Sequence, residues 1–163
     1  MMTMTTAHVS PRTAVVPVHA VWGAAAGLVG GMGMGVWMSV SRPVMDTAMI
    51  TMVAGLLGST NAVVGWLVHL AIALFAGTGF GVLLGRYVRG PVPAALLGLA
   101  YGVVWWVLGA LWILPANMGR PVFAWNAVTR SSLGAHLVFG LLTGLAFFAV
   151  ARAAARRTTT AGR

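Results

Sequence analysis

The sequence predicts an all-α integral membrane protein with four transmembrane helices. Of its 163 residues, 60% are hydrophobic and only 7% are charged, whereas a soluble domain carries about a quarter charged residues. The chain also contains apolar runs without acid, lysine or arginine, each about 20 residues long and so able to cross roughly 30 Å of hydrocarbon. These runs cover residues 21–40, 62–84, 94–114 and 133–151.

The segments outside these runs predict the topology. Residues 1–18 are expected to form a flexible tail, residues 19–151 a single transmembrane domain, and residues 152–163 a basic, disordered tail. With four spans, seven of the ten arginines lie on the side of both termini and three on the other side. The positive-inside rule then predicts a multi-pass protein of the cell inner (plasma) membrane with both termini in the cytoplasm. Because the arginines flank spans, we expect contact with lipid headgroups and no nucleic-acid binding.

The first span carries a strip of small residues. Gly23, Gly27, Gly31 and Gly35 recur at every fourth position, where each glycine would weaken a helix in water by about 1 kcal/mol. In lipid, such a strip allows two helix backbones to approach closely. We expect these strips to support helix packing and association into a homo-oligomer or a larger membrane complex.

Residues 44–60 follow the first span and are apolar but short. A fifth span here would place the C-terminal arginines outside, against the charge rule, so we expect a short interfacial or re-entrant helix between spans 1 and 2. Asp46, the only acidic residue, is expected to be the N-cap of this helix. Its alternative role is as a partner of Arg42 or Arg130.

The second and fourth spans each carry one histidine in a strip of small residues. The first strip comprises Gly65, His69, Ala73, Gly77, Gly81 and Gly85, and the second comprises Ser132, His136, Gly140 and Gly144. An offset of 67 aligns His69 with His136, and an offset of 75 aligns the preceding spans. These matches predict an internal repeat of residues 20–85 and 94–151, that is, two tandem two-helix units. Repeats of this orientation place both histidines at one depth on parallel helices.

The histidine pair has four interpretations. Each imidazole can hydrogen-bond within the bundle, to Thr78, Ser132 or Thr143 or to a backbone carbonyl. His69 and His136 can instead be the axial ligands of haem b or ligands of another metal such as copper or zinc, although two histidines alone do not complete a zinc site. A proton-relay or pH-sensing pair is the fourth interpretation.

Methionines recur at helical spacing near the same part of the chain. Met34 and Met38 are one turn apart in the first span, and Met45, Met49 and Met52 follow in the next segment. Methionine at such spacing is usually adaptable packing. Thioethers also bind Cu(I), so a copper path is the alternative interpretation.

Several absences narrow the function. There is no cysteine, which excludes disulfides and thiolate sites. The four predicted spans contain no acidic residue, and the sequence has no phosphate-binding loop, dinucleotide fingerprint or zincin motif. We therefore expect a protein that is not an enzyme, most simply a membrane subunit or scaffold. The alternatives are a haem- or metal-binding electron-transfer protein and a small-solute or copper permease.

Four stretches of the chain also resemble a known family. GAAAGLVGGMGM, GWLVHLAIALFAGTGFGVLLG, YGVVWWVLGALWILPANMG and SLGAHLVFGLLTGLAFF resemble uncharacterised small four-span integral membrane proteins of bacteria and archaea, which carry a histidine in the second and fourth spans. The resemblance covers about residues 20–150 and implies a four-helix membrane fold but no activity. The positions that carry it are Gly65, Trp66, His69, Tyr101, Gly102, Trp105, Pro115, Gly119, His136, Phe139 and Gly140, with phenylalanine at 139 where the family has tyrosine.

Overall fold

A computed structural model describes residues 11–42 and 46–161. Within these residues the regular structure is helical and there is no strand. The long elements are α1 (Pro11–Val40), α3 (Ala62–Leu84), α4 (Pro91–Trp105) and α6 (Ala127–Ala161). Short elements join them: α2 (Met49–Ala54), η1 (Gly55–Leu57), η2 (Gly85–Tyr87), the π-helical η3 (Trp106–Ile113) and α5 (Leu114–Asn117).

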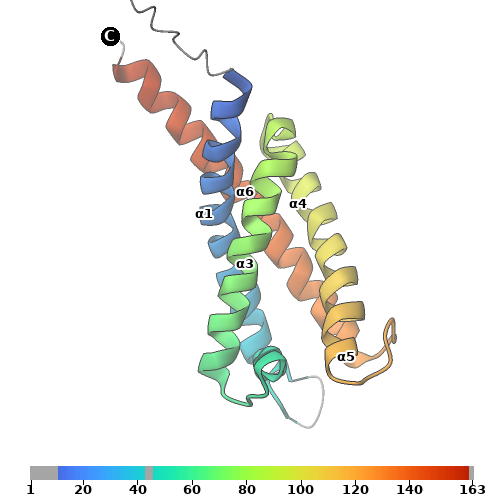
Figure 1. Cartoon of the computed structure of the whole chain (residues 1–163). Helices are drawn as coiled ribbons and strands as arrows, with labels where there is room; N and C mark the ends of the chain where they lie inside the picture. Colours follow the sequence, from blue (N-terminus) through green and yellow to red (C-terminus); the bar gives the residue numbers. More distant parts are fainter. Residues whose placement is uncertain (1–10, 43–45, 162–163) are drawn as a thin grey trace, which may run out of the picture.

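The prediction of an all-α fold with four spans is confirmed. The helices long and apolar enough to cross a membrane cover Pro17–Val40, Ala62–Tyr87, Pro91–Asn117 and Ala127–Arg157. Figure 1 shows the start of α1 and the end of α6 at one end of the bundle, and α2 and α5 at the other end, here called the α2 end. Helices α1 and α6 pack against each other, α3 packs chiefly on α1, and α4 packs chiefly on α6. Contacts between α3 and α4 are sparse, and the two helices diverge towards the α2 end (Figure 1).

Glycines bring the helix backbones together within two pairs. Gly23 of α1 lies directly against Gly77 and Gly81 of α3. In the second pair, Gly98 of α4 lies against Gly140 of α6. At each of these positions an added Cβ would overlap backbone atoms of the other helix. The chain uses these glycines for contacts between its own helices. Association into a homo-oligomer or a larger membrane complex stays a prediction.

The α1–α3 pair and the α4–α6 pair pack in the same way. The residues that match in the two pairs differ by one helical turn from those that the sequence alignment matches. Gly27 lies against Ala73 in the first pair, and its aligned counterpart Gly102 lies against His136 in the second. The contacts therefore match Ala73 with His136, whereas the alignment matches His69 with His136. The internal repeat stays a prediction, and the contacts relate α3 to α6 at an offset of 63 where the sequence alignment uses 67.

Both predicted tails are shorter than expected. α1 begins at Pro11, so residues 11–18 are helical, and α6 continues to Ala161, so residues 152–161 are helical. Proline is favoured at the first position of a helix. Alanine and arginine, which dominate residues 151–157, are strong helix formers. Residues 1–10 and 162–163 lie outside the described residues.

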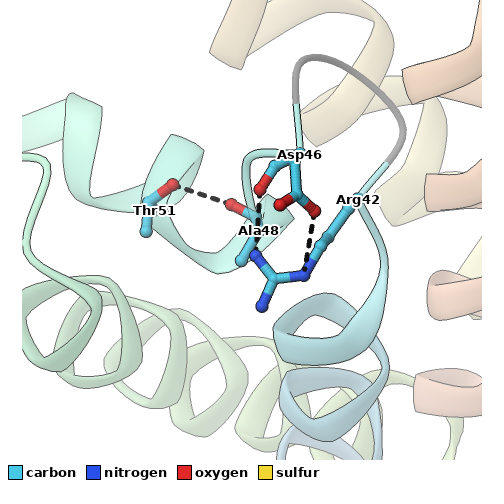
Figure 2. A network of polar contacts seen from close by, with 4 residues as sticks. All are labelled: Arg42, Asp46, Ala48 and Thr51. Carbon is cyan, nitrogen blue, oxygen red and sulfur yellow. Dashed lines mark hydrogen bonds and ion pairs between the residues drawn. The ribbon is translucent and has the colours of Figure 1, made fainter.

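Asp46 is not the N-cap that the sequence suggests. α2 begins only at Met49, and its N-cap is Ala48, which makes no side-chain capping bond. Asp46 adopts a positive φ of 53° and pairs with Arg42, whose Nε lies 3.5 Å from Oδ1 (Figure 2). Arg42 Nη1 also donates to the backbone carbonyl of Asp46 at 2.9 Å. The alternative prediction of an Arg42 partner is confirmed; the interfacial or re-entrant position of α2 stays a prediction.

Candidate histidine–methionine cavity

An apolar cavity of about 320 Å³ lies in the half of the bundle nearest the α2 end. Its walls come from α3 on one side and from η3 on the other, with α1 and α6 behind and α2 across the end. On the side between α3 and η3, the cavity is lined by Ile72, Phe75 and Ile113, whose side chains are exposed at the surface. The cavity therefore opens sideways, towards the region that lipid would occupy. Both His69 and His136 line it.

His69 is fixed to α1 by a hydrogen bond. Its side chain is buried, with 5% of the residue exposed, and Nε2 lies 2.8 Å from the carbonyl oxygen of Gly31. A carbonyl oxygen can only accept, so Nε2 carries the hydrogen and donates it. In the neutral imidazole, Nδ1 then carries the free lone pair. The ring also packs edge-on against Trp66, with centroids 6.2 Å apart.

His136 is fixed in the same manner by its own helix. Its Nδ1 lies 2.7 Å from the carbonyl oxygen of Ser132, one turn earlier in α6. Nδ1 is therefore the donor, and Nε2 carries the lone pair of the neutral ring. Nε2 points towards η3, since it lies 3.9 Å from where a Cβ at Gly109 would be. Each histidine thus has one nitrogen held by a backbone carbonyl and one nitrogen left as an acceptor.

These bonds refine the prediction that the histidines hydrogen-bond within the bundle. A backbone carbonyl was among the expected partners and is the one used in both cases. The expected hydroxyl partners are not used: Thr78 donates to Leu74, the Thr143 hydroxyl is buried without a partner, and Ser132 Oγ donates to Thr129.

The π-helical segment η3 forms one wall of the cavity, and the apolar run that contains it did not predict a π-helix. Gly109, Ala110 and Ile113 of η3 line the cavity. The indole of Trp106, at the start of η3, donates to the Thr129 carbonyl at 2.9 Å and to Ser132 Oγ at 3.2 Å. π-helical turns are rare and often occur at functional sites. The only sequence signal at this position is the small pair Gly109–Ala110.

Four methionines complete the cavity lining. Met34 and Met38 come from α1, and Met49 and Met52 come from α2. Met34, Met38 and Met49 are also part of a buried core cluster, as the packing interpretation expects. The fifth methionine, Met45, lies outside the described residues. The structure thus brings thioethers from two separate segments to the cavity that holds both imidazoles, a proximity that their spacing in the sequence does not predict.

No family model, curated protein or solved structure matches this chain. The resemblance to small four-span proteins of bacteria and archaea therefore stays a prediction.

The donor set is unsuited to zinc. No three His, Cys, Asp or Glu side chains come together in the part of the chain that the structure describes. Structural zinc sites use four ligands and catalytic sites use three protein ligands, drawn from these residue types. Asp46, the only acid, is highly exposed and paired with Arg42.

The arrangement also disfavours bis-histidine haem. The nitrogen left free on His69 is Nδ1, because Nε2 donates to Gly31. Nδ1 is adjacent in the ring to the carbon that carries Cβ, and this substituent hinders its approach to iron at the centre of a flat macrocycle. His136 offers the more accessible Nε2. The pair is therefore better suited to a small ion than to haem b.

Proposed function

We propose that this protein is a non-enzymatic, multi-pass membrane protein that binds a metal cation between its helices, with His69 and His136 as ligands. The supporting observation is that both histidines line one cavity and each donates one ring N–H to a backbone carbonyl. Histidines that bind metals almost always have such an arrangement, because the second hydrogen bond fixes the tautomer and orients the ring. The remaining lone pairs are then available to a cation.

The proposed topology follows the arginine distribution. Both termini and the α3–α4 connection, with Arg86 and Arg89, would lie in the cytoplasm of a cell whose plasma membrane holds the protein. The α2 end, with the cavity, would then lie towards the outer surface. The bound cation would be exchanged with the outer side rather than with the cytoplasm.

The decisive experiment is metal analysis of the purified full chain. The protein is purified in detergent from cells grown with a mixture of transition metals, and bound metals are measured by mass spectrometry. We expect a stoichiometric metal in the wild type and its loss in the double variant His69→Phe/His136→Phe. His19→Phe is the matched control, since His19 packs against Trp22 and Phe147 and does not line the cavity.

Two results would contradict the proposal. A folded, colourless and metal-free wild type would leave the role of subunit or scaffold, in which the histidines only join helices. An absorption spectrum with a Soret band and split reduced α/β bands, lost in either histidine variant, would instead establish bis-histidine haem b. We expect no such bands.

A further inference from the structure

We propose that the bound cation is Cu(I), and that it reaches the histidines along the methionines from the α2 end. This inference rests on the proposed function and deepens it by naming the ion and its route. The observations that carry it are the absence of charged side chains from the cavity lining and the order of the thioethers along α1 and α2.

The described lining of the cavity is uncharged. None of these side chains is Asp, Glu, Arg or Lys, and the polar ones are two imidazoles, a serine and an indole. A cation in apolar surroundings is stabilised only by its ligands when no counter-charge is present, and burying an unpaired charge is expensive. In a continuum description this desolvation penalty grows with the square of the charge, so a divalent ion is penalised about four times as much as a monovalent one. A monovalent cation is therefore favoured.

The ligands on offer are soft. Among the described side chains that line the cavity, the groups able to bind a metal are neutral imidazoles, thioethers and one serine hydroxyl. Thioethers select Cu(I) among the common biological cations, whereas carboxylates, carbonyls and water suit magnesium, calcium and manganese. Alkali cations also prefer oxygen ligands. Cu(I) is thus the monovalent ion that matches both the nitrogen and the sulfur donors.

Two of the methionines lie just beyond the His69 contact on α1. The His69 imidazole is bonded to Gly31 of α1, and Met34 and Met38 follow Gly31 by three and seven residues. At 1.5 Å per residue they lie about 4.5 and 10.5 Å further along α1 towards the α2 end. Both residues are buried and line the cavity.

The route continues onto α2, which closes that end of the cavity. The backbone N–H of Met49 donates to the Ser41 carbonyl at 3.1 Å, which holds the start of α2 against the end of α1. Met49 and Met52 both line the cavity from α2. The thioethers are therefore ordered from α2 through Met38 and Met34 to the imidazoles. Methionine has three rotatable bonds, so its sulfur can turn towards an ion without movement of the helix.

Methionine-to-leucine variants separate copper binding from packing, because leucine keeps the apolar volume and removes the sulfur. The purified full chain in detergent is titrated anaerobically with Cu(I) in competition with a chromogenic Cu(I) chelator. We expect Met34→Leu/Met38→Leu to weaken Cu(I) binding by at least about tenfold, the loss typical even of a group that only supports a metal ligand. Met32→Leu is the matched control, since Met32 lies on the same helix but is 50% exposed and outside the cavity.

X-ray absorption at the copper edge gives an independent readout. We expect sulfur as well as nitrogen scatterers in the wild type, and loss of sulfur in Met34→Leu/Met38→Leu. Wild-type affinity for the double methionine variant, or binding of Zn(II) as tight as that of Cu(I), would overturn this inference while the proposed metal site stood. Failure of the wild type to bind any metal would overturn the proposed function itself.

Discussion

Gly140→Ala tests whether close backbone packing stabilises the bundle. Gly140 of α6 lies against α4, and an added Cβ would stand 2.8 Å from the carbonyl carbon of Gly98 and 3.0 Å from the Cα of Gly102. These are backbone atoms of a helix, so they cannot rotate away as a side chain would. Favourable carbon–carbon contacts are about 3.5–4.0 Å, and the Gly98 carbonyl oxygen lies closer still to the added Cβ, so α4 and α6 must separate locally by about 1 Å or more.

The size of the effect follows from this separation. A gap of about 0.5–1 Å forfeits roughly a quarter to a half of the dispersion energy of each contact, and overpacking typically costs about 1–3 kcal/mol. The better helix propensity of alanine returns up to about 1 kcal/mol. We therefore expect Gly140→Ala to lower the free energy of unfolding by about 1–2 kcal/mol, a factor of about 5–30 in the ratio of folded to unfolded protein.

The assay is reversible unfolding in mixed micelles, followed by helical circular dichroism as the fraction of denaturing detergent is raised. Gly55→Ala is the matched control, because the nearest atom to its added Cβ is the flexible Met118 Cε at 3.7 Å. This control is expected to be as stable as the wild type or slightly more stable. Equal stability of Gly140→Ala and Gly55→Ala would refute the reasoning and show that α4 and α6 are not held at the distance seen here.

Three further predictions concern caps, charges and topology. Asn126 Oδ1 accepts from two backbone N–H groups at the start of α6. Asn126→Ala should therefore lower the free energy of unfolding by about 1 kcal/mol, whereas Asn126→Asp, which keeps an acceptor oxygen, should not. Equal losses in the two variants would rule out the cap. Asp46→Asn should change the free energy of unfolding by less than about 1 kcal/mol, because its ion pair with Arg42 is exposed. The hydrogen bond from Arg42 to the Asp46 backbone carbonyl also remains in this variant. A larger loss in the same unfolding assay would mean that the pair is shielded from water. The chain has no native cysteine, so a membrane-impermeant maleimide should label Arg120→Cys in intact cells and Arg89→Cys only after permeabilisation. The reverse pattern would invert the topology, and labelling of both from one side would contradict four spans.

The spans were predictable from the sequence because the bilayer imposes a simple requirement. Each crossing needs about 20 apolar residues with all backbone groups bonded internally, and the runs at 62–84 and 133–151 meet it without reference to the rest of the chain. The ends of the helices were less predictable. Residues 152–161 carry charge, which suggested a disordered tail. Their alanine and arginine residues favour a helix, and α6 continues through them.

The cavity was not predictable, because it depends on how separate segments meet. The sequence predicted His69 and His136 at one depth, whereas the glycine contacts match His136 with Ala73, one turn from His69. It did not predict which carbonyl each imidazole would bond. It identified the spacing of Met34 with Met38 and of Met49 with Met52, but not that α2 folds across the end of the bundle. Asp46 illustrates the same limit, since a local capping preference gave way to a left-handed backbone and a bond to Arg42.

The close helix contacts and the histidine site are physically connected. Gly31, which accepts the His69 hydrogen bond, belongs to the glycine strip of α1, and the backbone carbonyl of His136 lies against Gly102. The positions of both imidazoles are thus set by the packing of α1 with α3 and of α4 with α6. A substitution at Gly102 would displace His136 without removing any ligand, so loss of metal in such a variant would report on helix spacing. Only variants that keep the volume and remove the donor atom, such as the methionine-to-leucine pair, identify ligands directly.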